Sequence, residues 1–353
     1  MKNIIQLTIC LLIVWAAQIA TATEIEHWQT TNGGRVYFMS TPSLPIVDIR
    51  IVFDAGSARD SGKSGLAALT NGLLAEGAAG MNADQIAEQF ADAGARFSNS
   101  SLKDMSIFSL RSLRDAKYLE PALKTFIQVI SQPDFPDEAV ERVRRQMLSV
   151  IEFQKQSPGN IANEAFYKTL YADHPYGTPS IGTAETVSAL AHEELKTFYS
   201  TYYVASNAVI AIVADLDKAA AEKLAEQLTM SLQTGKKASA LPEPKALTEA
   251  SVMNIKHPAD QTHVMLGQLG MSRFDPDYFT LYVGNHILGG GGLVSILADE
   301  IREKRGLSYS VYSGFAPMRI AGPFIMGLQT KNDQAENAIK VVRETVASFI
   351  ENG

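Results

Sequence analysis

The feature that most constrains the fold of this 353-residue chain is an internal repetition. The junction Gly94-Ala95-Arg96-Phe97, where a helical pattern gives way to a strand pattern, has a counterpart at Gly306-Leu307-Ser308-Tyr309. The two junctions lie 212 residues apart, counted from Phe97 to Tyr309 (309 minus 97). Repetition at a fixed offset indicates a duplicated structural unit. We therefore expect two similar domains.

Hydrophobic periodicity gives both halves the same order of elements, namely a strand, two helices, two strands and a long helix. The first half is expected to place strands at 35–40, 46–54, 95–101, 106–112 and 208–214, and helices at 64–75, 82–93, 115–130 and 137–154. The second half is expected to place strands at 262–270, 307–315 and 322–330, and helices at 276–288, 293–304 and 333–349. The pattern predicts an α+β fold in which each domain is a mostly antiparallel sheet covered by helices.

Composition shifts give the expected domain limits. Residues 23–232 form the N-terminal domain, residues 251–353 form the C-terminal domain, and residues 233–250, which hold Pro242 and Pro244, form the linker. Applied to Asp215, the repeat offset puts the end of a complete second domain near residue 427. On this reasoning about 75 residues of the second domain are absent, so we expect it to be incomplete.

Residues 1–22 have the pattern of a signal peptide. Lys2 is the only charge, an apolar run covers residues 4–17, and Ala20-Thr21-Ala22 forms a small-x-small cleavage site. We expect a mature protein that begins at Thr23 and is periplasmic or secreted, with no membrane attachment after cleavage. A retained membrane anchor is the alternative, because the apolar run is near the lower length limit for spanning a bilayer.

The charge balance argues against a nucleic-acid partner. The formal net charge is −7, and the densest basic pairs, Arg144-Arg145 and Lys236-Lys237, are typical of solvated surface. Cys10, the single cysteine, lies inside the signal sequence, so the mature chain has no disulfide.

Several stretches along the chain resemble one family of peptidases. They are Asp54-Ala55-Gly56-Ser57-Ala58-Arg59-Asp60 with Gly62 to Ala67, His174-Pro175-Tyr176-Gly177, and Leu288-Gly289-Gly290-Gly291 running into Ile301 to Ser310. Together they resemble the insulinase/pitrilysin (inverzincin) zinc peptidases, in the form of bacterial processing peptidases. The resemblance implies two similar domains that face one another across a polar chamber.

The zinc motif of active relatives is missing. Those relatives carry His-x-x-Glu-His on the helix after the Gly-Leu-Ala stretch, where two imidazoles one turn apart grip zinc and the Glu activates water. The matching positions here are Ala68, Asn71 and Gly72, which supply neither ligand nor base. The third ligand would fall at Ser149 or Val150. We expect no metal in this chain, and zinc in a homologous partner subunit.

Arg302 and Tyr309 are the candidate functional residues. Relatives without zinc ligands resemble this chain in keeping an Arg and, seven residues later, a Tyr, and the resemblance implies that the pair faces the partner's zinc. An Arg at the end of a helix and a Tyr opening the next strand would project toward one point, where they can hold a peptide carbonyl and stabilise an oxyanion. The alternative is that Arg302 belongs to a solvated helix end and that Tyr309 is an ordinary half-buried aromatic residue of a strand.

The resemblance implies a non-catalytic subunit of an exported heterodimeric zinc endopeptidase that acts on peptides or unfolded protein. The alternative is an inert binding or scaffold protein on the same fold. An independently active peptidase is disfavoured, because no Ser/His/Asp order and no reactive cysteine is evident. His174, which precedes Pro-Tyr-Gly, is expected to fix a loop through a hydrogen bond rather than to bind a metal.

Overall fold

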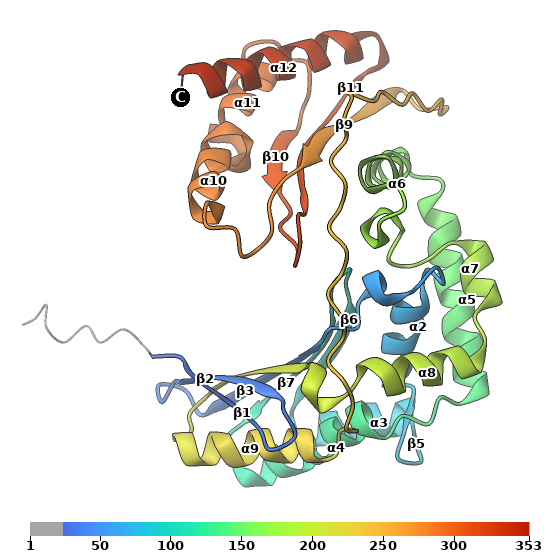
Figure 1. Ribbon diagram of the computed structural model, residues 1–353, viewed down its shortest axis with the longest axis vertical. Helices are drawn as coiled ribbons and strands as arrows, with labels where there is room; N and C mark the ends of the chain where they lie inside the picture. The colour runs from blue at the N-terminus through green and yellow to red at the C-terminus, as the bar shows by residue number, and fades with distance from the viewer. Residues whose placement is uncertain (1–23, 353) are drawn as a thin grey trace, which may run out of the picture.

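A computed structural model describes residues 24–352 and shows two α+β units joined by an extended segment (Figure 1). We call residues 24–232 unit 1 and residues 261–352 unit 2; residues 234–260 between them contain no helix or strand. The expected signal peptide lies outside the described residues. Among residues 24–352, no helix combines the length and the apolar character needed to cross a membrane.

Unit 1 is built on a six-stranded sheet with the order β1-β2-β8-β3-β7-β6. The strands are β1 (Glu26–Gln29), β2 (Arg35–Ser40), β3 (Ile46–Phe53), β6 (Arg96–Ser101), β7 (Ser106–Leu113) and β8 (Ala208–Ala214). All neighbours pair antiparallel except β2 and β8, which are parallel. The prediction of a mostly antiparallel sheet is therefore confirmed.

Helices cover one face of this sheet, because alternate strand residues such as Val47, Ile49 and Ile51 point into a single apolar core. The helices are α2 (Leu66–Leu73), α3 (Ala83–Asp92), α4 (Ala116–Ser131), α5 (Asp137–Gln154), α6 (Pro158–Tyr171), α7 (Ala184–Ala189), α8 (His192–Tyr202) and α9 (Lys218–Met230), and β4 (Gly77–Ala78) pairs with β5 (Met81–Asn82). Helix α2 packs against α5 and α8 and is mostly buried.

Unit 2 repeats the central part of unit 1. Its three-stranded antiparallel sheet has the order β10-β11-β9, so β11 lies between β9 and β10 as β7 lies between β3 and β6. The elements are β9 (Gln261–Leu269), α10 (Tyr278–Asn285), α11 (Ile296–Ala298), β10 (Val311–Phe315), β11 (Pro323–Lys331) and α12 (Ala335–Asn352). The buried pair Val264–Leu328 corresponds to the buried pair Ile49–Leu110. The predicted duplication is present in the topology.

One predicted strand boundary in unit 2 is wrong. The pattern placed a strand at 307–315, but β10 begins at Val311. The Ser308 side chain lies 2.6 Å from the carbonyl oxygen of Ser310 and 2.7 Å from that of Gln329, which holds residues 307–310 as a turn. Gly306 has φ +60°, like Gly94 at +59°, so the left-handed helix stop occurs where the sequence predicted it.

The two units meet through a small apolar cluster. Its buried members are Ala58, Leu170, Tyr171 and Tyr176 of unit 1, and Leu269, Met318 and Ile320 of unit 2 pack against them. Helix α6 of unit 1 also lies against β9, where a Cβ on Gly267 would approach the Phe166 ring to 2.8 Å. The junction therefore depends on a glycine in β9 and on aromatic side chains from α6.

Candidate functional site

The position of the lost zinc motif on α2 is occupied by a buried hydrogen-bond network. The Asn71 amide donates to Ser106 Oγ at 2.5 Å, and Ser106 Oγ lies 2.8 Å from the Tyr203 hydroxyl. Asn99 donates to the Asn71 side-chain oxygen at 3.1 Å and to its carbonyl at 2.8 Å. Asn71 is thus a structural residue in unit 1, and both ends of its side chain are engaged.

The residues at the motif positions do not fit a zinc ion. Ala68 and Gly72 have no donor atom, and the Asn71 amide cannot act as a base. Ser149, one of the two positions for the third ligand, bonds back to the carbonyl of Arg145 within its own helix at 2.9 Å. Within residues 24–352 there is no grouping of three or more His, Cys, Asp or Glu that could hold a metal ion.

Arg302 and Tyr309 come together in unit 2. Arg302 lies in the last turn before Gly306, within a short π-helical stretch, Asp299–Glu303. Its guanidinium carbon lies 4.8 Å from the centre of the Tyr309 ring, a cation–π contact. Tyr309 is 86% exposed, so its hydroxyl is available to a ligand. The two side chains are in contact, and Tyr309 projects from the turn before β10 and not from the strand.

The Arg302–Tyr309 pair stands apart from the degenerate motif. Among the described residues, no hydrogen bond, ion pair or apolar cluster joins it to α2. Arg302 lies 3.5 Å from Glu303, an exposed carboxylate that leaves the face of its guanidinium to Tyr309. The pair is therefore an exposed feature of unit 2 alone.

An ion-pair cluster at the junction was not anticipated from the sequence. Arg59 holds Asp54 through two bonds of 2.8 Å, and Arg319, from the β10–β11 loop of unit 2, also donates to Asp54. The backbone N–H of Arg319 donates to Asp104 at 2.8 Å, and Asp104 accepts from the Tyr176 hydroxyl. The loop of unit 2 is thereby fixed by two carboxylates of unit 1.

Two titrating groups lie beside this junction. Burial raises the pKa of Asp60 to about 7. The backbone N–H groups of Gly65 and Ala67 each donate a hydrogen bond of 2.8 Å to Asp60, and these bonds act in the opposite direction by lowering its pKa. Burial likewise lowers the pKa of Lys103 to about 8. Asp60 caps the N-terminal end of α2, so its charge state is coupled to that helix.

His174 has the structural role expected of it. Its Nδ1 accepts a hydrogen bond of 3.1 Å from the N–H of Tyr176. This bond caps the start of a single 3-10 turn, Pro175–Gly177. Its Nε2 lies 2.9 Å from the carbonyl of Pro242, in the segment between the units. The imidazole ties that segment to unit 1, and the prediction of a loop-fixing residue is confirmed.

Comparison with protein families agrees with this layout. Residues 35–184 match the model described as insulinase (peptidase family M16), and residues 189–353 match the model described as the peptidase M16 inactive domain. An uncharacterized zinc protease of Rickettsia felis is 27% identical over 323 residues, which cover 91% of this chain and 77% of that protein. An uncharacterized zinc protease of Bacillus subtilis is 24% identical, and the match covers 79% of that protein.

Solved structures give the same result. The crystal structure of a peptidase M16 inactive domain from Pseudomonas fluorescens is 42% identical, with a TM-score of 0.92, and the match covers 94% of this chain and 80% of that one. A protease from Helicobacter pylori is 20% identical with a TM-score of 0.82, over 93% and 80% of the two chains, which shows the shared fold.

Proposed function

Because the chain belongs to the insulinase (M16) peptidase family, we propose that it is the non-catalytic Arg/Tyr subunit of an exported heterodimeric zinc endopeptidase. The partner is a homologous subunit that carries His-x-x-Glu-His and the zinc. This chain contributes Arg302 and Tyr309, which bind the peptide and donate hydrogen bonds as negative charge develops on its carbonyl oxygen.

The observation that carries the proposal is the geometry of the Arg302–Tyr309 pair. A guanidinium held 4.8 Å from an exposed tyrosine ring places one cationic and one hydroxyl donor side by side. Such donors stabilise a carbonyl oxygen as it becomes an oxyanion. Ala68 and Gly72 have no side-chain atom that could bind a metal, and the Asn71 side chain is held in a buried hydrogen-bond network. Both facts support the assignment of the metal to another subunit.

Reconstitution tests this function. The partner for the test is a family member with the intact zinc motif, from the organism that encodes this chain. Cleavage of quenched fluorescent peptides is measured for three samples: the partner alone, this chain alone, and the two proteins mixed. We expect no cleavage by this chain, and a rate for the mixture well above that of the partner. Cleavage by this chain alone would contradict the proposal. A complex that forms without any gain in rate would favour the scaffold function.

A further inference from the structure

The turn that carries Tyr309, residues 307–310, is held by the hydroxyl of the preceding residue. Ser308 is buried, and its Oγ lies 2.6 Å from the carbonyl oxygen of Ser310 and 2.7 Å from that of Gln329. The same Oγ accepts from the N–H of Ser310 at 3.2 Å. A hydroxyl has one proton and two lone pairs, so it donates to one carbonyl at a time while it accepts from the amide. The contact with Ser310 closes the turn, and the contact with Gln329 ties the turn to β11.

A second buried hydroxyl fixes the start of the same turn. Thr330 follows Gln329 on β11, is buried, and donates from Oγ1 to the carbonyl of Leu307 at 2.5 Å. The Leu307 side chain belongs to the apolar core of unit 2. Two consecutive residues of β11 are thus bonded to the two residues that precede Tyr309.

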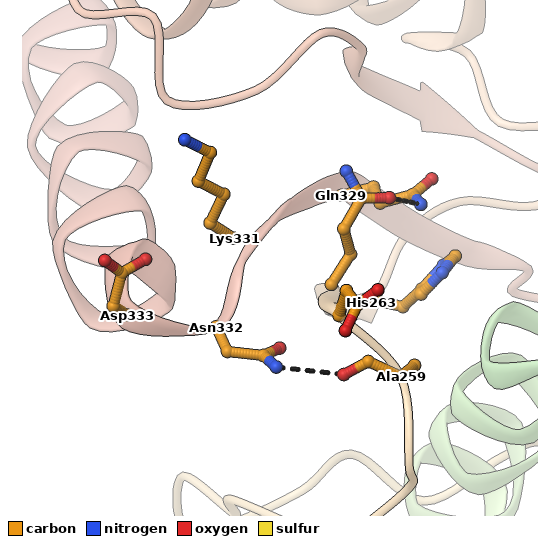
Figure 2. A pocket seen from close by; sticks show the side chains of 8 residues that line it. Ala259, His263, Gln329, Lys331, Asn332 and Asp333 are labelled. Atoms are coloured by element: carbon orange, nitrogen blue, oxygen red, sulfur yellow. Dashed lines mark hydrogen bonds between the residues drawn. The ribbon is translucent and has the colours of Figure 1, made fainter.

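The strand to which the turn is bonded is itself held on both sides. β11 pairs with β10 along one edge and with β9 along the other. Gln329 lies opposite His263 of β9, and its side chain donates to the side chain of Gln261 (Figure 2). The turn therefore rests on a rigid base, which is what a precisely placed side chain requires.

The backbone that carries Arg302 is fixed independently of this turn. Ile301 is buried in the core of unit 2, and its carbonyl accepts from the N–H of Leu307 at 2.9 Å. The carbonyl of Arg302 accepts from the N–H of Gly306 at 3.0 Å. These two bonds satisfy carbonyls at the helix end and set the helix against the start of the turn. The conformation of the turn then decides how the Tyr309 ring meets the guanidinium.

The Tyr309 hydroxyl is sensitive to that conformation. It stands at the far end of a long side chain, so a small rotation of the turn displaces the hydroxyl more than the backbone. One cation–π contact at an exposed site is weak, so the contact with Arg302 does not fix the ring by itself. A misplacement of about 1 Å can cost roughly a hundredfold in the rate of a catalysed reaction.

We propose that Ser308, supported by Thr330, is the positioning residue of the Arg302–Tyr309 pair. Its hydroxyl holds the turn so that the Tyr309 ring lies against the guanidinium before a peptide arrives. Ser308 acts through Tyr309 and touches no substrate. The effect on catalysis rests on the proposed function, whereas the effect on the geometry of the pair concerns this chain alone.

The first experiment uses the full chain without a partner. A guanidinium that lies over an aromatic ring has an NMR resonance shifted by the ring current. In the chain labelled with 15N-arginine, the Arg302 Nε–H resonance is compared with its position in Tyr309→Leu, which has no ring. We expect Ser308→Ala and Thr330→Val, each of which removes one hydroxyl, to move the resonance most of the way to that position.

Ser313 supplies the matched control within unit 2. It is buried on β10, and its Oγ donates to the side-chain oxygen of Asn285 at 2.7 Å. Ser313→Ala therefore also removes a buried hydroxyl and is expected to leave the Arg302 resonance in place. Urea unfolding of Ser308→Ala and Ser313→Ala compares their stabilities, so that a general loosening of unit 2 is separated from a change at the pair.

The second experiment measures kcat and KM of the reconstituted heterodimer. Ser308→Ala is expected to lower kcat about tenfold or more and to leave KM within about twofold, because a donor used in the transition state is misplaced. Ser313→Ala is expected to retain both values. If Tyr309→Phe retains the full rate, the proposed function fails, and the Arg302 resonance then decides the positioning role by itself.

Three results would overturn the inference. The first is an Arg302 resonance at its wild-type position in both Ser308→Ala and Thr330→Val. The second is an equal displacement of that resonance in Ser313→Ala. The third is an unchanged kcat for Ser308→Ala in a heterodimer whose kcat falls with Tyr309→Phe.

Discussion

Replacing Arg319 should loosen the junction between the units while leaving each unit folded. Its side chain is 34% exposed and donates to Asp54, which is 9% exposed and keeps the two bonds from Arg59 when Arg319 is lost. A hydrogen bond to a charged group contributes about 1.5–3 kcal/mol, and partial exposure together with the remaining Arg59 pair reduces this. We therefore expect Arg319→Ala to cost about 1–2 kcal/mol, well below the cost of an uncompensated buried charge.

The assay is hydrogen exchange of the 316–322 loop together with proteolysis of residues 234–260. One kcal/mol or more corresponds to roughly a fivefold or greater increase in the open population. Arg319→Lys, which keeps one cationic donor, should lie between wild type and Arg319→Ala. Arg114→Ala removes a more exposed pair with Asp215 inside unit 1 and is the control. Equal loosening by Arg114→Ala and Arg319→Ala would refute the role of Arg319 at the junction.

Three further outcomes are expected. The purified chain should bind no stoichiometric zinc after mild dialysis, because Ala68 and Gly72 have no donor atom, and one zinc per chain in a metal analysis would contradict this. The Asp60 contribution to stability should be full below its usual pKa of 3.8 and be lost as pH rises through about 7, since burial favours the protonated form. The loss is at most about 4 kcal/mol. Urea unfolding between pH 4 and 8 should show this decline in wild type and a smaller one in Asp60→Asn; parallel profiles would rule out titration of Asp60. Mature protein should begin near Thr23, and mass spectrometry that finds the intact N-terminus on the functional protein would contradict the signal peptide.

The hydrophobic pattern of the sequence correctly predicted elements that pack within their own unit. β8 was placed at its observed limits, Ala208–Ala214, because its small and branched apolar residues are typical of a buried strand. The limits of α5, Asp137–Gln154, were also predicted, with an acidic first turn. The strand expected at 307–315 was misplaced at its start because Ser308 bonds within a turn, and periodicity carries no sign of such a bond.

The candidate site was predicted in part. The resemblance to peptidases without zinc ligands singled out Arg302 and Tyr309, and the two side chains are in contact. The sequence did not indicate that Arg319 would reach Asp54, because the two are 265 positions apart and only the tertiary arrangement of the units brings them together. The structural use of Asn71 was missed for the same reason, since Ser106 lies on a different strand.

The most direct test of the proposed function is the cleavage rate of the reconstituted heterodimer with variants of the Arg302–Tyr309 pair. Arg302→Ala and Tyr309→Phe each remove one donor, and the loss of one such donor typically lowers the rate about a hundredfold or more. A second cation–π pair on unit 2, with Arg273 4.1 Å from the Tyr278 ring, supplies the matched control. With complex formation verified by sedimentation, we expect Arg302→Ala and Tyr309→Phe to lose most of the rate and Arg273→Ala to retain it. Full cleavage by intact heterodimers of both Arg302→Ala and Tyr309→Phe would contradict the catalytic contribution of this chain.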